Sequence, residues 1–330
     1  MSLAQKSSGW RPSASINTLK QRAGILSALR HFFEKRGVLE VETPQLSHAV
    51  GTDPFLHYFS TDFSLPNIPS THMLYLQTSP EFAMKRLLAA HSGPIFQICK
   101  AYRNGEVGHL HNPEFTLLEW YQPGFDHHAL IQDVDLLLQS VLHSQPGHSI
   151  SYQALFETHF HFNPHTATLE EIRKKALSRA HSWENSLIDR FDKDTWLQYL
   201  LATFIEPTLG QESPCYVYDF PQSQAALARL RREDTFFVAE RFEVYVKGIE
   251  LGNGFHELCD PDEQKQRFLN DLQIRETQRC PLPPLDQHFL AALSSLPPCA
   301  GIAMGIDRLI MLATQASSIK EVLSFPFENS

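Results

Sequence analysis

Residues 96–121 read FQICKAYRNGEVGHLHNPEFTLLEWY, and in this stretch two apolar, strand-like runs flank a polar loop. Its polar and aromatic side chains are Arg103, Glu106, His109, His111, Asn112, Glu114, Phe115 and Glu119. A strand, a loop and a returning strand can hold an arginine and an aromatic ring over one cavity, as the binding of a nucleotide and its phosphates requires. A surface hairpin with a charged turn has the same pattern, so this stretch alone leaves both interpretations open.

Residues 301–308, GIAMGIDR, form a second informative segment and continue into the apolar run LIML. Gly301, Ala303 and Gly305 leave one face of a predicted strand almost bare, which suits a flat ligand lying against the backbone. Arg308 falls in the first turn of the following helix, where the helix dipole does not favour a cation, so we expect it to have a phosphate as partner. A glycine-rich strand packed under a helix, with Arg308 in an ordinary ion pair, is the alternative.

Residues 18–36 are predicted to form an amphipathic helix that ends at Gly37 and leads into VLEVETP. Its apolar face consists of Ile25, Leu29, Phe32 and Phe33. The three segments, in this order, resemble motifs 1, 2 and 3 of class II aminoacyl-tRNA synthetases, the lysyl branch in particular. The similarity extends from about residue 22 to residue 327, and three ordered motifs are far more specific than one glycine-rich pattern.

The composition places the chain among soluble globular proteins. Of its 330 residues 42% are hydrophobic and 20% charged. No apolar run reaches the length of a membrane-spanning helix, and the first residues lack the apolar stretch of a signal peptide. The five cysteines are scattered without CxxC spacing, so we predict free thiols and a cytoplasmic protein.

The formal net charge of −9 bears on the binding partner. Proteins bind long nucleic acids largely through lysine and arginine, so an acidic chain without a basic run is a poor candidate for binding tRNA. An acidic surface suits a basic protein partner or a cationic small substrate.

The order of predicted elements indicates an α+β fold with a mostly antiparallel sheet flanked by helices. Residues 1–17 are polar and predicted to be a loose arm, and residues 18–330 a single class II synthetase-like catalytic domain. Strand-like runs occur at 73–77, 95–102, 114–121, 216–220 and 236–258, and helical ones at 127–143 and 260–279. Residues near 151–206 are predicted to be a helical insertion without chemistry of its own.

The resemblance implies roles in binding ATP for residues of motifs 2 and 3. Arg103 would bridge the substrate carboxylate and the α-phosphate, because a planar guanidinium can neutralise two anions at once. Phe115 would stack on adenine, although without the motif it would be interpreted as a core aromatic. Arg308, the second catalytic arginine, would cover the other face of adenine or bind the γ-phosphate. The remaining residues predicted to line the nucleotide are Asn104, Gly105, His111, Asn112, Glu250, Leu251 and Gly305.

Gly105 departs from the family pattern. The lysyl branch usually has a glutamate at this position, whereas this chain has Gly105 followed by Glu106. An adenine contact is then either lost, taken over by Glu106 or made by the backbone.

Glu243 and Glu250 are the predicted Mg²⁺ ligands. They lie in RFEVYVKGIEL at a spacing that would place them on opposite faces of one strand, so Lys247 and Gly248 must form a turn or bulge. The resemblance implies that they hold Mg²⁺ against the ATP phosphates, for which carboxylates are suitable ligands. Two exposed strand glutamates are the alternative.

The resemblance also implies a pocket for a substrate with two amines. Glu81 would bind the inner ammonium, and Glu257 with Tyr121 the distal one, because buried carboxylates need paired cations. Ser79, Pro80 and Asn253 complete the predicted pocket. Glu257 could instead be the residue that leads into the 260–279 helix.

Two positions separate the chain from lysyl-tRNA synthetases. Ser79 stands where these enzymes usually have alanine and Ala303 where they usually have glycine, and such changes reshape a tightly packed site. Motif 1 also begins almost at the start of the sequence, without an anticodon-binding barrel before it. This pattern resembles the family of ligases that join (R)-β-lysine to elongation factor P.

That resemblance implies an ATP-dependent, homodimeric ligase that forms an aminoacyl-adenylate, with AMP and pyrophosphate as products. Two alternatives stay open at this point. One is an enzyme that acylates tRNA, which the acidic charge, Ser79 and Ala303 disfavour. The other is an inactive paralogue that senses an amino acid; Gly105 favours it, whereas Arg103 and the two acidic residues do not.

Overall fold

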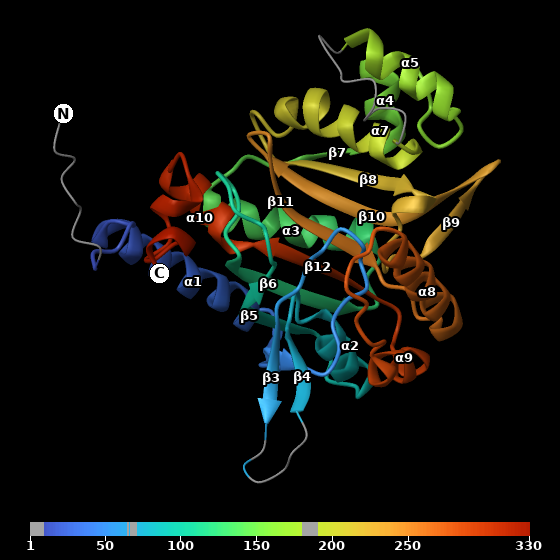
Figure 1. Ribbon diagram of the computed structural model, residues 1–330. Helices are drawn as coiled ribbons and strands as arrows, with labels where there is room; N and C mark the ends of the chain where they lie inside the picture. The colour runs from blue at the N-terminus through green and yellow to red at the C-terminus, as the bar shows by residue number, and fades with distance from the viewer. Residues whose placement is uncertain (1–9, 65, 67–70, 180–190) are drawn as a thin grey trace, which may run out of the picture. The chain divides into compact units, whose positions relative to one another are not determined.

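The structure is a computed structural model that describes residues 10–64, 66, 71–179 and 191–330. Most of the predicted arm, residues 1–9, and part of the predicted insertion, residues 180–190, lie outside the described residues. The described part of the chain separates into two compact units. Figure 1 labels the helices and strands. The predicted division into an arm and one catalytic domain stays a prediction.

The main sheet has nine strands in the order β1-β5-β6-β12-β11-β10-β8-β7, with β9 paired to β10. The strands are β1 (Leu39–Glu40), β5 (Ile95–Tyr102), β6 (Glu114–Pro123), β7 (His148–Ser151), β8 (Cys215–Pro221), β9 (Leu230–Glu233), β10 (Phe236–Val246), β11 (Ile249–His256) and β12 (Cys299–Gly305). The β10 ladders with β8, β9 and β11 are antiparallel, whereas β1–β5 and β7–β8 are parallel. The predicted α+β class is confirmed, with a mixed sheet.

The first unit comprises Met1–Trp120, Pro261–Leu293 and Met304–Ser330. Its helices are α1 (Ile16–Glu34), α2 (Glu81–Ala89), α8 (Pro261–Thr277), α9 (Gln287–Ala292) and α10 (Ile306–Thr314), and β2 (Leu46–Ser47), β4 (Thr71–Leu76) and β3 (Ser60–Ser64) form a small antiparallel sheet. The amphipathic helix predicted over 18–36 is α1, which Ser15 caps by accepting from the N–H of Thr18. Phe33 of α1 stacks on Phe96 of β5 with ring centroids 4.5 Å apart.

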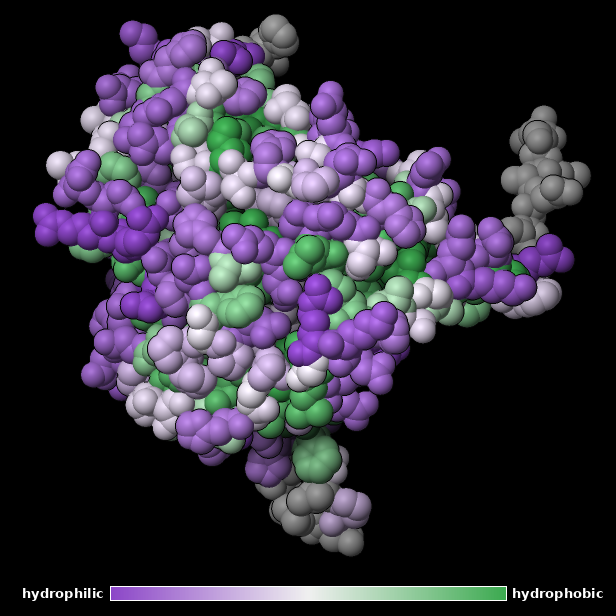
Figure 2. Space-filling view, turned by 180° about the vertical axis from the view of Figure 1, so that it is seen from behind, coloured by the Kyte–Doolittle hydropathy of each residue, from purple (hydrophilic) through white to green (hydrophobic). Residues whose placement is uncertain are grey.

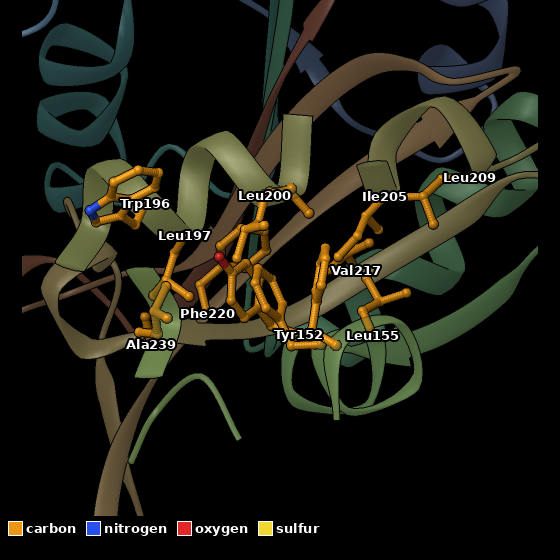
Figure 3. Packing of buried hydrophobic residues seen from close by; sticks show 14 of the residues in the cluster. Tyr152, Leu155, Trp196, Leu197, Leu200, Ile205, Leu209, Val217, Phe220 and Ala239 are labelled. Atoms are coloured by element: carbon orange, nitrogen blue, oxygen red, sulfur yellow. The ribbon is translucent and has the colours of Figure 1, made fainter. Parts of the chain in front are cut away.

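The second unit comprises Tyr121–Asp260 and Ser294–Ala303. It holds α3 (His127–Leu142), α4 (Tyr152–Phe160), α5 (Leu169–Arg179), α7 (Lys193–Leu200) and strands β7 to β11. The helices of the predicted insertion bury their apolar faces on the sheet: Tyr152, Trp196 and Leu200 share one cluster with Val217 and Phe220 of β8 (Figure 3). Burial of such apolar area is the main force that holds these helices in place.

In the part of the chain that the structure describes, no helix is long and apolar enough to cross a lipid bilayer. Figure 2 shows hydrophilic side chains over most of the face that it presents, with hydrophobic ones in small groups between them.

Candidate active site

The loop between β5 and β6 is held by its backbone. The N–H of Arg103 donates to the carbonyl of Pro113 at 2.9 Å, which closes the loop, and the N–H of Asn104 donates to the carbonyl of His57 at 2.8 Å. These bonds fix the first and last residues of the loop in the first unit. The predicted strand, loop and returning strand are therefore present.

Arg103 lies over the ring of Phe115. Its guanidinium carbon is 5.0 Å from the ring centroid, a cation–π distance, and its Nη1 is 3.8 Å from a carboxylate oxygen of Glu106. That ion pair is long, and the buried Nε of Arg103 makes no hydrogen bond within the described residues. Phe115 is half-buried and not a core aromatic. The pair thus offers a rigid cation with donors that an anion can use.

Gly105 has a φ of +84°, and a Cβ at this position would meet no atom within 4 Å. The glycine is therefore required by the left-handed turn and not by lack of space. A glutamate at the same position would bear the cost of this conformation. Glu106 supplies the carboxylate nearest Arg103, and its role as a substitute for the missing glutamate stays a prediction.

Arg308 lies in the first turn of α10 and contacts the same loop. Its Nη2 is 2.7 Å from Nε2 of His111, and its Nε donates to the carbonyl of Leu110 at 3.3 Å. The contact joins two residues that were predicted to bind the nucleotide. Gly305, the residue before α10, is its N-cap.

The side-chain amide of Asn112 makes two structural hydrogen bonds. Its Nδ2 donates to the carbonyl of Glu114 at 2.6 Å, and its Oδ1 accepts from the N–H of Phe327 at 2.9 Å. The side chain thus ties the loop to the C-terminal segment. Beyond its bonds to the described residues, one amide hydrogen and one lone pair of Oδ1 can contact a nucleotide.

Asp307 and Arg22 were not assigned a role from the sequence. Asp307 is 1% exposed, pairs with Nη1 of Arg22 at 2.6 Å and accepts from the N–H of Thr116 at 2.8 Å. It fixes α10 to α1 and β6, and so it positions the neighbouring Arg308. The only sequence signal for this role is that an acidic residue opens a helix.

Ser79 connects Glu81 of the predicted amino-acid pocket to Glu119, a carboxylate that was not assigned to that pocket. Its hydroxyl donates to Oε1 of Glu119 at 2.7 Å and accepts from the N–H of Glu81 at 3.1 Å. Pro80, between them, precedes the first residue of α2. The serine that departs from the family pattern therefore anchors both the buried Glu119 and the start of the helix that carries Glu81.

The carboxylate of Glu81 has a partner that sequence reasoning missed. Nζ of Lys85 lies 2.5 Å from its Oε1, and Lys85 is only 1% exposed. The i,i+4 spacing of the two residues on a helix was the available signal. Glu81 and Lys85 thus form an ion pair whose lysine is buried, which lowers the net negative charge that Glu81 offers to an ammonium group. Glu119, as buried as Lys85, lies within residues 96–121 and was not assigned a role from the sequence.

Glu243 and Glu250 lie on the two strands of one hairpin. The turn between β10 and β11 is formed by Lys247 and Gly248, with φ values of 51° and 74°. The prediction that these two residues turn the chain is confirmed. Both have positive φ, as hairpin turns of this length require.

A bulge in β11 places Glu250 on the same face as Glu243. Val244 pairs with Gly252, but Tyr245 pairs with Glu250, so Leu251 is the extra residue. Without it Tyr245 would face Leu251, and the carboxylate of Glu250 would lie on the opposite face. Leu251 itself is buried.

Glu243 is buried, so the alternative of an exposed strand glutamate is wrong for it. One carboxylate oxygen accepts from Nη2 of Arg241 at 2.6 Å and the other from the hydroxyl of Tyr245 at 2.5 Å. Burial raises the pKa of Glu243, the Arg241 guanidinium opposes this, and the negative charge of Glu250 raises the pKa further. The two carboxylates are suitable ligands for a hard divalent cation such as Mg²⁺, whereas the Arg241 guanidinium is not a ligand and reduces their net negative charge.

Tyr121 and Glu257 meet over Gly301. A Cβ at Gly301 would lie 2.2 Å from the Tyr121 ring and 2.7 Å from Oε1 of Glu257, so only glycine fits there. The prediction of a flat ligand on the bare strand face was therefore wrong at Gly301, because the ring of Tyr121 lies there. Glu257 is buried and donates its N–H to the carbonyl of Cys299, whereas α8 begins only at Pro261. The alternative that Glu257 opens the helix is also wrong.

Asn253 lies opposite Glu243 in the hairpin and accepts from Nε of Arg241 at 3.1 Å. Ala303 is half-buried on β12. The predicted residues that the structure brings into contact are Arg103 with Phe115, Arg308 with His111, Ser79 with Glu81, and Tyr121 and Glu257 around Gly301.

The chain is similar over almost its whole length to known proteins. A family model described as tRNA synthetases class II (D, K and N) matches residues 2–329. The chain is 53% identical over 317 residues to the elongation factor P–(R)-β-lysine ligase of Pseudoalteromonas translucida. The aligned region covers 96% of this chain and 97% of that protein. Proteins of the same name from Haemophilus ducreyi and Salmonella paratyphi B are 50% and 49% identical over 322 residues, or 97% of this chain and 97% and 98% of theirs.

Proposed function

Because the chain belongs to the class II tRNA synthetases of the D, K and N type, we propose that it is an ATP-dependent ligase that joins (R)-β-lysine to elongation factor P. The observation that carries the proposal is the identity of 49–53% over almost the whole chain to relatives whose names state this reaction. Neither an enzyme specific for tRNA nor an inactive sensor accounts for that similarity as well.

In the first step a carboxylate oxygen of the amino acid attacks the α-phosphorus of ATP. The bond between the α-phosphorus and the bridging oxygen breaks, and pyrophosphate leaves. Arg103 is the proposed cation that neutralises the two approaching anions, and its stacking on Phe115 fixes the guanidinium in advance. Preorganised charge of this kind is usually the largest contribution to catalysis. Arg308, held by His111, is the proposed second cation on the phosphates.

Glu243 and Glu250 are the proposed Mg²⁺ ligands. The bulge that puts both carboxylates on one face, and the burial of Glu243, support this assignment. When bound, the ion would neutralise charge on the ATP phosphates. Tyr245 and Arg241 orient the carboxylate of Glu243 through their hydrogen bonds.

The amines of the substrate are assigned to two carboxylates. Glu81 is the proposed partner of the inner ammonium and Glu257, with Tyr121, of the distal one. The burial of Glu257 supports its assignment, because a buried carboxylate gains most from a cation. In the second step the ε-amine of a lysine on elongation factor P attacks the carbonyl of the mixed anhydride, and AMP leaves. Placement and charge stabilisation suffice for both steps.

We also propose that the protein is a cytoplasmic homodimer. The five cysteines are all free, as in a reducing compartment. Ile16, Leu39 and Leu46, in or beside the segment that resembles motif 1, are exposed apolar side chains, which supports an interface there. Sedimentation equilibrium that shows a monomer at micromolar concentration would contradict the dimer.

The choice of acceptor is tested directly. We expect mass spectrometry to detect β-lysylation of elongation factor P in the presence of ATP and (R)-β-lysine, and acylation of bulk tRNA to be negligible beside it. The physical reason is the net charge of −9, which opposes binding of a polyanion. Elongation factor P whose acceptor lysine is replaced by arginine is the control. Comparable rates for the two acceptors would overturn the choice of partner.

The choice between lysine isomers is expected to depend on Ser79 and Ala303. In the Ser79→Ala/Ala303→Gly variant the start of α2 and Glu119 lose their shared hydroxyl, so the inner ammonium site shifts relative to the carboxylate site. A displacement of about 1 Å can cost roughly 100-fold in rate. We expect the ratio of kcat/KM for β-lysine over α-lysine, measured by pyrophosphate exchange, to fall by about that factor. An unchanged ratio would place the discrimination elsewhere, with Tyr121 and Asn253 the next candidates.

A further inference from the structure

Two histidines and a carboxylate converge in the second unit, outside the residues assigned to the reaction. His127 is the first residue of α3, Glu240 belongs to β10 and His256 is the last residue of β11. One ligand atom from each lies within 4.8 Å of the other two, and among the described residues no other group of three or more His, Cys, Asp or Glu meets this criterion. We name these three residues the histidine cluster.

One buried polar atom of the histidine cluster has no partner among the described residues. Nδ1 of His256 lies 2.7 Å from Oε2 of Glu240, and Nε2 of His127 lies 3.4 Å from Oδ1 of Asp219, so these atoms face one another in ion pairs. Nδ1 of His127, whose side chain is 2% exposed, has neither a hydrogen bond nor an ion pair. Buried polar atoms are nearly always satisfied, so this nitrogen indicates that an ion or water binds there.

The carboxylates of Glu240 and of the neighbouring Asp219 are already oriented. Arg231 pairs through Nη2 with Oδ2 of Asp219 at 2.7 Å and through Nε with Oε1 of Glu240 at 3.4 Å. The other oxygen of each carboxylate faces a histidine. Such outer contacts to ligating carboxylates are typical of metal sites, where they fix the ligands before the ion arrives.

We propose that His127, Glu240 and His256 bind a divalent transition-metal ion of the zinc class, with Asp219 as the fourth ligand. Imidazole nitrogens together with carboxylate oxygens are a usual ligand set for zinc. In a tetrahedral site with zinc–ligand distances of about 2.0–2.2 Å the ligand atoms lie roughly 3.4 Å apart, so atoms that now lie within 4.8 Å of one another have to approach by about 1.4 Å at most. Because the ligands come from α3, β8, β10 and β11, the ion clamps the start of the helix to the sheet.

Replacement of Arg229 distinguishes a metal site from an ordinary ion-paired cluster. Its Nη1 lies 3.3 Å from Nε2 of His256. Coordination through Nδ1 puts the ring proton on Nε2, where it faces the donors of Arg229. Arg229 is exposed and has to turn away when the metal binds. Its replacement therefore favours the metal, whereas replacement of a ligand opposes it.

The test uses the untagged full chain, stripped with a chelator and titrated with Zn²⁺ against a competing chromogenic chelator. We expect one strong site in the wild type. His127→Gln and His256→Gln should each weaken binding by about 100-fold, and Arg229→Gln should leave it equal or tighter. His31→Gln, at an exposed histidine of α1, is the matched control and should bind as the wild type does. Thermal unfolding should show a Zn²⁺-dependent rise in Tm that the two ligand variants lose.

A second measurement needs no variant, so it holds even where a substitution impairs folding. Wild-type protein loaded with Co²⁺ should show the intense visible absorption of a four-coordinate site. Weak, octahedral-type absorption, no tight Zn²⁺ site in the wild type, or equal affinity in wild type and His256→Gln would each overturn the proposal. The histidine cluster would then be a hydrated ion-pair network. The assay does not involve the ligase reaction, so its outcome is independent of the proposed function.

Discussion

Replacing Arg103 with alanine is expected to lower amino-acid-dependent pyrophosphate exchange by about 30- to 1,000-fold, equivalent to about 2–4 kcal/mol of transition-state stabilisation. The variant removes the guanidinium that lies over Phe115 and whose ion pair with Glu106, the one it makes among the described residues, is 3.8 Å long. That loop contains no other arginine. The measurement is the exchange of labelled pyrophosphate into ATP, with ATP and each lysine isomer at saturating concentration.

Arg103→Lys is the matched control, because it keeps the charge but loses the planar fork. It should recover only part of the lost activity. Arg308→Ala should show a loss of similar size, since its side chain is held at the same loop by His111. Near-wild-type exchange in either alanine variant would show that the arginine in question has been misassigned.

Gly301→Ala is expected to reduce kcat/KM for the amino acid by roughly 100-fold or more. The added methyl group would lie 2.2 Å from the ring of Tyr121 and 2.7 Å from a carboxylate oxygen of Glu257, so both side chains have to move. A shift of about 1 Å at the substrate-binding groups suffices for a loss of this size. The measurement is pyrophosphate exchange as a function of amino-acid concentration.

Overpacking also destabilises proteins by about 1–3 kcal/mol, so Tm has to be measured alongside. Gly24→Ala is the matched control: Gly24 lies within α1, where a Cβ meets no atom within 4 Å. That variant should keep full activity and unfold at an equal or higher temperature, because alanine favours a helix. Full activity in Gly301→Ala would exclude Tyr121 and Glu257 from the amino-acid site.

Much of the fold follows from local patterns. The apolar stripe on residues 18–36 predicted α1, and the alternation over 236–258 predicted β10 and β11. If Glu243 and Glu250 were to face one site, Lys247 and Gly248 had to turn the chain. These two residues do form the turn. Hydrophobic periodicity and turn-forming residues involve positions close in sequence, so helices, strands and turns can be predicted from the sequence alone.

The candidate site depended on contacts that no local pattern contains. Arg22 and Asp307, near opposite ends of the chain, form a pair that positions Arg308. Glu119, forty residues from Ser79, accepts its hydroxyl hydrogen. The sequence shows that such polar residues are present, but the choice of partner is made by packing in three dimensions, where a buried charge has to find one.

The sequence by itself determined the α+β class, the order of the three motifs and the residue types of the site, because each depends only on the spacing or the composition of the residues. Only the tertiary structure decided which groups face one another. The extra residue Leu251 turns Glu250 to the face of Glu243, and the ring of Tyr121 takes the space above Gly301. A single inserted residue reverses the faces of a strand, and close packing leaves room for one arrangement, so both outcomes are properties of the folded chain.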